Sequence, residues 1–198
     1  MLKRSLHAAV AALLLGSGAA SAEMHTYQVT ATVTYSADTS VAVGSKLQAS
    51  FAYDDTNSAW WASGDSVFYD NYTFLTSTWS GHSASSDLVH VTVRDQADGA
   101  FDIVEIYSAD PIVLDGALLA EGVFMIHLQT DAYHTDAIRG PNMPTTYNMA
   151  DWSPVRSYGL IQRDGTQTGA IVQFSIDSIE TQCLKQNGMI AKKNCWSH

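Results

Sequence analysis

Positive charge is scarce in this chain. Its 198 residues include 10 Lys and Arg against 20 Asp and Glu, which gives a formal charge of −10. Proteins that bind nucleic acid use Lys and Arg to displace the counterions of the phosphate backbone, so we do not expect nucleic acid as a partner. Charged residues make up 15% of the chain and hydrophobic residues 46%. A disordered chain is more charged and less apolar than this, so we expect a folded domain.

Long apolar runs are missing as well. The one at the N-terminus spans residues 8–15, follows Lys3 and Arg4, and is followed by the small residues Ala20 and Ala22. This order is typical of a secretory signal peptide, and the run is shorter than the roughly 20 residues of a membrane-spanning helix. We expect cleavage after Ala22, a secreted or periplasmic protein, and no transmembrane segment in the mature chain.

Cysteine is rare, because Cys183 and Cys195 are the only two. Exported proteins meet an oxidising environment, and Asn187-Gly188 provides a turn between the two thiols, so we expect one disulfide bond. Two thiols fall short of the four ligands of a structural zinc site. The expected organisation is a signal peptide (1–22), a β-sandwich domain (23–180) and a C-terminal disulfide loop (181–198).

Helical periodicity is absent from the mature chain, whose apolar residues repeat with a period of two. Between Thr26 and Tyr35 the odd-numbered positions are Tyr, Val, Ala, Val and Tyr, and Thr or Gln fills the others. This pattern predicts a half-buried strand. Similar patterns predict further strands at 47–53, 67–79 (one bent strand or two short ones), 88–94, 101–107, 123–130, 158–162 and 170–179. We predict an all-β, antiparallel β-sandwich or jelly-roll-like fold of about eight or nine strands.

One motif suggests hydrolysis. Gly64-Asp65-Ser66 is similar to the nucleophile block of GDSL-type esterases, and Asp131 and His134 have the Asp-x-x-His spacing that this family uses for the rest of its triad. The resemblance implies a serine hydrolase that uses Ser66, Asp131 and His134. That family has a flavodoxin-like α/β fold, whereas the pattern here predicts strands and no helices. A turn that happens to contain Gly-Asp-Ser is the simpler interpretation.

Imidazoles and carboxylates suggest a transition-metal site. His127, Asp131, His134 and Asp136 fall within ten positions, and such side chains bind zinc and related ions. His127, however, lies in a predicted strand, where it could equally face the solvent. The paired spacings of known zinc motifs are missing, so we assign no transition metal.

Aspartates in turns suggest calcium, which takes its ligands from carboxylates and loop carbonyls. Asp95, Asp98 and Asp102 surround a predicted hairpin turn and are the calcium candidates. Aspartate also favours turns for conformational reasons alone. We therefore assign no cofactor, and structural calcium is the one candidate that the sequence leaves open.

Aromatic residues suggest a ligand platform. Trp60 and Trp61 stand together after a polar turn. Sugar-binding β-sandwiches present flat aromatic surfaces to pyranose rings, so an exposed Trp pair would form such a surface, and a buried pair would belong to the core. Trp60 and Trp61 are the ligand-binding candidates.

Four segments can be compared with known proteins: Phe51-Ala52-Tyr53-Asp54-Asp55, residues 122–128, Met143-Pro144 and residues 169–179. They resemble a group of uncharacterised exported bacterial proteins, many of which carry a PEP-CTERM sorting tail. The resemblance implies a β-sandwich, export, and a place at the cell surface or in an extracellular matrix. A cysteine loop stands here where those proteins have the tail. We expect a secreted, non-catalytic binding or matrix protein with polysaccharide or other surface components as partners. A secreted GDS-type serine hydrolase is the alternative.

Overall fold

A computed structural model describes residues 24–54, 59, 61–63, 66–71, 73–97, 101–109, 111–131, 137–138, 142–164 and 169–182. These ranges contain thirteen β-strands, one short 3-10 turn and no α-helix. None of the described residues belongs to a helix long and apolar enough to cross a membrane. The predicted signal peptide and both cysteines lie outside the described residues.

The strands share a high content of β-branched and aromatic residues, which favour the pleated backbone. They are β1 (Met24–Ser36), β2 (Lys46–Asp54), β3 (Trp61–Ser63), β4 (Ser66–Asn71), β5 (Leu75–Trp79), β6 (His82–Ser86), β7 (Val89–Ala97), β8 (Phe101–Ala109), β9 (Ile112–Leu114), β10 (Ala117–Leu119), β11 (Val123–Gln129), β12 (Tyr158–Gln162) and β13 (Ala170–Gln182), with the 3-10 turn η1 (Met149–Asp151) before β12.

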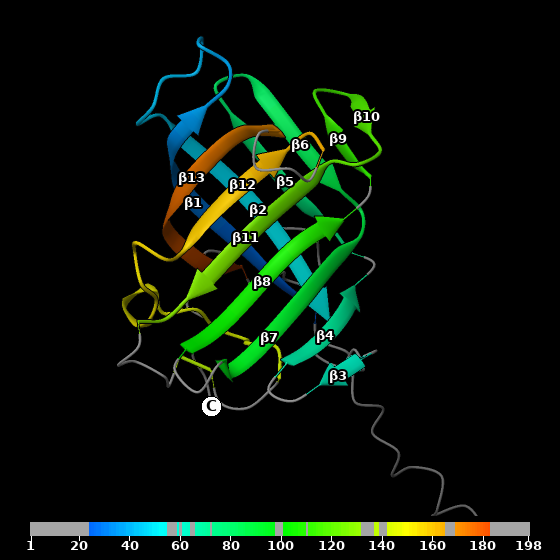
Figure 1. The fold of residues 1–198 in the computed structure, drawn as a ribbon, viewed down its shortest axis with the longest axis vertical. Helices are drawn as coiled ribbons and strands as arrows, with labels where there is room; N and C mark the ends of the chain where they lie inside the picture. Colours follow the sequence, from blue (N-terminus) through cyan, green and yellow to red (C-terminus); the bar gives the residue numbers. More distant parts are fainter. Residues whose placement is uncertain are drawn as a thin grey trace, which may run out of the picture.

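All thirteen strands belong to one antiparallel sheet, in the order β10-β9-β6-β5-β2-β1-β13-β12-β11-β8-β7-β4-β3. The sheet curls, so that β7, β8, β11 and β12 cross the front of Figure 1 and β1, β2 and β5 lie behind them. The prediction of an all-β, antiparallel protein is confirmed. Eight or nine strands were too few, and the two separate layers of a sandwich or jelly roll are here the two halves of one curled, half-barrel sheet.

The alternation in β1 places its side chains as predicted, except at the end. Tyr27, Val29 and Ala31 are fully buried between the two halves of the sheet. Tyr35 is 46% exposed, although it was predicted on the buried face. The pairing of β1 with β13 shifts register between Val33 and Tyr35, and this irregularity turns the end of the strand around.

The segment predicted as one bent strand or two short ones at 67–79 forms two strands in different halves of the sheet. β4 pairs with β7 in the front half, whereas β5 lies between β2 and β6 in the rear half. Both halves send apolar side chains inward, where Phe51, Phe124 and Phe174 are fully buried. The core therefore lies between the halves, and the opposite face of each half is free to carry a site.

Residues 142–157, all of them described and none of them in a strand, form a segment that closes one end of the core. Tyr147 and Trp152 from this segment are buried, and the Pro144 carbonyl accepts hydrogen bonds from the hydroxyls of Tyr27 and Tyr53. The Tyr53 and Tyr147 hydroxyls lie 3.0 Å apart and share a further hydrogen bond. These contacts fix the segment to β1 and β2.

Candidate functional site

The outer face of the front half carries a cluster of polar and aromatic side chains. Alternation along β7, β8, β11 and β12 sends one set of side chains into the core and the other set outward. Register pairs the outward residues in two neighbouring rows that cross all four strands and in a third row that contains Arg94 and Gln129. We call this set the outer-face cluster; it consists of His90, Thr92, Arg94, Glu105, Tyr107, Met125, His127, Gln129, Tyr158 and Leu160.

One row centres on Glu105, which lies opposite His127 in the pairing of β8 with β11. Glu105 Oε1 is 3.1 Å from His127 Nδ1, and its Oε2 accepts a hydrogen bond from Arg94 at 3.2 Å. The Tyr158 ring lies beside the His127 ring, with centroids 5.0 Å apart and planes 30° apart. Tyr158 is 40% exposed. The Glu105 carboxylate thus fixes the His127 ring, and the partly exposed Tyr158 ring packs against that ring.

The neighbouring row repeats this arrangement. Asp70 from β4 contacts His90 Nδ1, and the His90 ring stacks on Tyr107 with centroids 5.2 Å apart and planes 29° apart. Met125 faces Tyr107 on one side and Leu160 on the other. Each row therefore combines a carboxylate, an imidazole and a phenol.

Burial and charge set the protonation states of these groups. Burial raises the pKa of Tyr107 and of Tyr158, and the Glu105 carboxylate acts on both in the same direction. Both phenols therefore keep their protons at neutral pH and can donate hydrogen bonds. The hydrogen bond from His127 holds the pKa of Glu105 below its usual range, against the effect of burial and with help from Arg94.

The lowered pKa of Glu105 predicts a specific loss of stability in acid. Ionised Glu105 favours the folded state, so its contribution is complete above the usual value of 4.5 and disappears as the pH falls through the lower folded pKa. We expect Glu105→Gln to lower the unfolding free energy by about 1 kcal/mol at pH 7 and by almost nothing near pH 3. Urea unfolding across this range measures the difference. Glu121→Gln, at an exposed turn, is the control and should show no such trend; an equal trend in both variants would contradict the assignment.

A separate hollow lies at one end of the curled sheet. Its volume is about 720 Å³, and it is lined by Ser36, Ala37, Asp38, Thr39, Trp79, His82, Leu114, Asp115, Arg163, Asp164, Gly169, Ala170 and Ile171. None of these residues belongs to the outer-face cluster. We call this hollow the end cleft.

The structure does not bring together the two described members of the predicted esterase triad. Ser66 lies in the same row as Arg94, Ile103 and Gln129, three strands away from β11. Three strand spacings are about 14 Å. Asp131 follows two residues after Gln129 and lies 3.6 Å from Arg156. His134 is outside the described residues, so the triad stays an untested prediction.

The other predicted site residues are described only in part. Trp60 lies outside the described residues, and of Trp61 only the backbone is described, in β3. Asp98 is also outside them, and so are Cys183 and Cys195. Asp102 is fully buried, and its Oδ2 accepts a hydrogen bond from the Ile138 amide, which places this calcium candidate inside the domain. Asp95 lies in β7, and among the described residues no group of three or more metal-binding side chains occurs.

Sequence spacing missed the outer-face cluster. Glu105, His127 and Tyr158 are separated by tens of residues, and only the pairing of β8, β11 and β12 unites them. The available signal was the outward position of each residue in its predicted strand.

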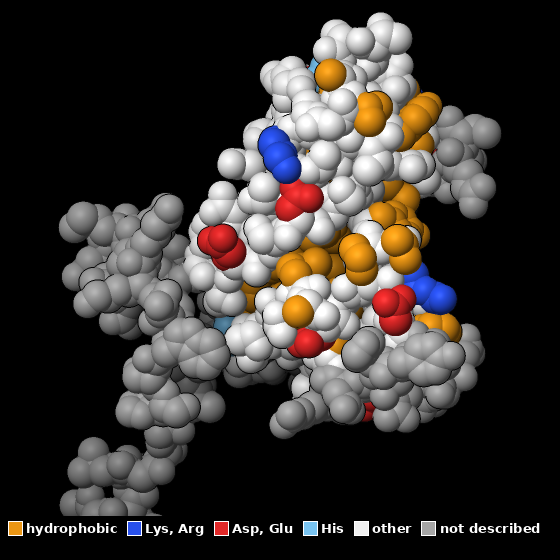
Figure 2. Space-filling view, turned by 90° about the vertical axis from the view of Figure 1, so that its left-hand side faces the viewer, with side chains coloured by type: hydrophobic (Ala, Val, Ile, Leu, Met, Phe, Trp, Pro, Cys, Tyr) orange, Lys and Arg blue, Asp and Glu red, His pale blue; other side chains and the backbone are white. Residues whose placement is uncertain are grey.

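Figure 2, seen from the side of β1 and β13, shows hydrophobic side chains gathered in the middle of that side, with isolated charges and no large patch of one sign.

The comparisons with known proteins add no assignment. The chain matches no protein-family model, no curated protein and no solved structure.

Proposed function

We propose that this chain is a non-catalytic binding protein that takes a neutral polysaccharide on the outer-face cluster. The observation that carries the proposal is the pair of tyrosines, Tyr107 and Tyr158, each packed against a histidine that a carboxylate holds in place. A ring fixed in this way contacts a ligand without first losing much conformational freedom. The fixed rings of Tyr107 and Tyr158 therefore favour a ligand-binding role for this face over a purely structural one.

The chemistry of a pyranose suits this surface. The C–H groups of a sugar ring form an apolar face that packs on aromatic rings, and the hydroxyls at its edge need hydrogen-bonding partners. Tyr107 and Tyr158 lie two strands apart, which is about 10 Å. Met125 lies on the strand between them and offers an apolar floor. A saccharide chain lying across the strands would reach both phenols.

The negative charge of the protein favours neutral saccharides over anionic ones. The chain carries a formal charge of −10, which repels uronate-containing polymers at low and moderate salt. Arg94 is already paired with Glu105, so it offers little compensation for an anionic ligand. Neutral glycans avoid this repulsion and still find hydrogen-bond donors in the phenols and acceptors in Glu105 and Gln129.

We also infer that the protein acts outside the cytoplasm, because its N-terminal segment predicts export and the resemblance implies a surface or matrix location. In this account, the curled sheet acts as a sandwich-like scaffold that keeps the outer-face strands rigid. Exported proteins of this kind meet polysaccharides in the cell envelope or in an extracellular matrix.

Binding of hexasaccharides tests the proposal. We expect the protein to bind at least one of cellohexaose, chitohexaose and maltohexaose in calorimetric titrations, and to bind an alginate hexamer more weakly. Tyr158→Ala should weaken binding about fivefold, because an aromatic contact contributes roughly 1 kcal/mol. Tyr35→Ala is the matched control, since Tyr35 is 46% exposed at the end of β1. Equal losses in the two variants, or no binding of any neutral hexamer, would reject the outer face as the site.

A further inference from the structure

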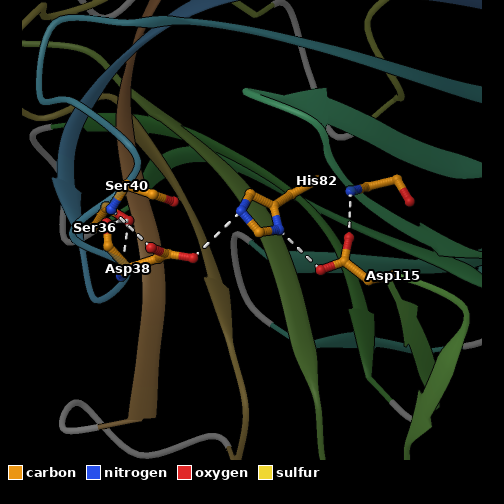
Figure 3. A network of polar contacts seen from close by, with 6 residues as sticks. Ser36, Asp38, Ser40, His82 and Asp115 are labelled. Carbon is orange, nitrogen blue, oxygen red and sulfur yellow. Dashed lines mark hydrogen bonds and ion pairs between the residues drawn. The ribbon is translucent and has the colours of Figure 1, made fainter.

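The end cleft is bridged by one histidine that contacts a carboxylate on each side. His82 Nδ1 lies 2.9 Å from Asp115 Oδ2, and its Nε2 lies 3.4 Å from Asp38 Oδ2 (Figure 3). Asp38 belongs to the loop between β1 and β2, and Asp115 to the turn between β9 and β10. The histidine therefore connects the loop before β2 with the turn after β9, and β5 and β6 lie between these two strands in the sheet.

The wall that carries His82 is built from two tight turns. Ser80 and Gly81 both have positive φ, as do Asp115 and Gly116, which is the conformation of two-residue hairpin turns. These turns place His82 at the start of β6 and Asp115 directly after the end of β9. The Asp115 carboxylate also accepts a hydrogen bond from the Ser83 amide at 2.8 Å. This side of the cleft is fixed by the sheet itself.

The opposite wall is the loop between β1 and β2, which the Ala37 amide ties to the Ile171 carbonyl at 2.9 Å and which the buried Val41 side chain fixes to the core. The Asp38 carboxylate accepts a hydrogen bond from the Ser40 amide at 2.8 Å, and the Ser36 hydroxyl contacts the Asp38 backbone. Asp38 and Asp115 are both about half exposed, with 45% and 46% of the side chain accessible. The His82 contact with Asp38 is thus a polar link across the cleft.

The protonation state of the His82 ring decides whether it can donate hydrogen bonds to Asp38 and Asp115 at the same time. A neutral imidazole carries one N–H and can donate to one carboxylate only, whereas an imidazolium donates to two. Histidine is the side chain that ordinarily changes charge between pH 5 and 8. In the neutral form, a ring nitrogen lone pair faces one of the two carboxylates, and that contact becomes repulsive. The longer contact, to Asp38, is the weaker of the two.

The other charged groups of the cleft keep their charge across this range. A hydrogen bond from the Ser40 side chain lowers the pKa of Asp38, and the hydrogen bond from His82 lowers that of Asp115, so both carboxylates stay ionised across the neutral range. Arg163 and Asp164 line the cleft from the turn after β12, and the Trp79 ring stacks on His82 at 5.7 Å. Neither Arg nor Asp ordinarily changes charge between pH 5 and 8.

We propose that His82 is a proton-operated latch: protonated, it holds the loop between β1 and β2 against the turn between β9 and β10 and narrows the end cleft; neutral, it releases Asp38 and lets the cleft open. This device is separate from the proposed saccharide site, because the cleft and the outer-face cluster share no residue. It would make access to the cleft depend on the pH of the compartment into which the protein is exported.

A distance measured across the cleft tests the latch. Val43 and Leu118 are 67% and 66% exposed, and they lie in the loop and in β10 on opposite sides of the cleft. We would replace both with p-acetylphenylalanine and attach spin labels there, which leaves the cysteines unlabelled. Pulsed electron resonance should give a narrow distance distribution at pH 5.5 and a longer, broader one at pH 8.5. The same distribution at both pH values would overturn the proposal.

Three variants assign the pH response to His82. His82→Gln cannot titrate, so its distribution should not change with pH. Asp38→Asn removes the charged partner on an exposed loop without touching the sheet, so it should give the open distribution at both pH values even if His82→Gln fails to fold. His90→Gln removes another histidine paired with a carboxylate and should keep the wild-type response. A pH response that survives in Asp38→Asn, or disappears in His90→Gln, would show that His82 is not the latch.

Discussion

Replacement of Gly159 by alanine is expected to destabilise the protein by about 3 kcal/mol, a large effect for one methyl group. Gly159 in β12 faces Phe174 in β13, and the Phe174 side chain is fully buried. A Cβ atom at Gly159 would overlap Cε2 and Cζ of the Phe174 ring. The ring cannot move away easily, because protein cores are close-packed. The glycine thus leaves room for an aromatic ring where the sheet passes from the rear half to the front half.

A double-mutant cycle separates this overlap from other effects of alanine. Unfolding in urea gives the free energies of the wild type, Gly159→Ala, Phe174→Leu and the double variant. Phe174→Leu removes the ring atoms that the new methyl group would meet, so Gly159→Ala should cost much less in that background. Additive costs, or a loss below about 0.5 kcal/mol for Gly159→Ala alone, would show that the packing described here is wrong.

Tyr147→Ala should cost about 4 kcal/mol, in the range of large aromatic deletions from cores. The Tyr147 ring packs edge-on against Tyr27 at 5.2 Å and against Phe51 at 6.2 Å, and it enters the core together with Trp152 from the same closing segment. Tyr147→Phe keeps the ring and removes only the hydroxyl. It should cost about 1 kcal/mol, because Tyr53 still donates to the Pro144 carbonyl.

Urea unfolding of both Tyr147 variants measures this difference between ring and hydroxyl. Val155→Ala is the control from the same segment, since Val155 is 87% exposed and should be close to neutral. If Tyr147→Phe costs as much as Tyr147→Ala, the hydroxyl network, rather than the packed ring, fixes the segment. If all three variants are neutral, the segment does not close the core.

The long strands could be predicted from sequence because their alternation extends over enough residues to show the period. β1 and β2 follow this rule, with every second side chain buried along most of their length. β3, β9 and β10 have three residues each, which is too short for any period to appear. β6 reads His-Ser-Ala-Ser-Ser and lacks the β-branched and aromatic residues that mark a strand. Its strand form depends on pairing with β5 and β9.

The sites were harder to predict than the strands. The outer-face cluster depends on which strands are neighbours, and strand order in this sheet does not follow the sequence: β13 lies between β1 and β12. Likewise, His82 lies beside Asp115 because β6 pairs with β9, although 32 residues separate Ser83 from Asp115 in the chain, and Asp38 comes from the loop between β1 and β2. His127 was considered as a metal ligand or a surface residue; it lies on the outer face, mostly covered, and contacts Glu105, Gln129 and Tyr158.

The most direct test of the proposed saccharide site is the methyl NMR signal of Met125. Met125 lies in the outer-face cluster next to Tyr107, whereas Met143 is only 6% exposed in the segment that closes the core. With carbon-13 in the methionine methyl groups, titration with the best-bound neutral hexasaccharide should shift the Met125 signal in a saturable way and leave the Met143 signal in place. A Met125 signal that stays unchanged at saturating ligand would contradict binding on the outer face.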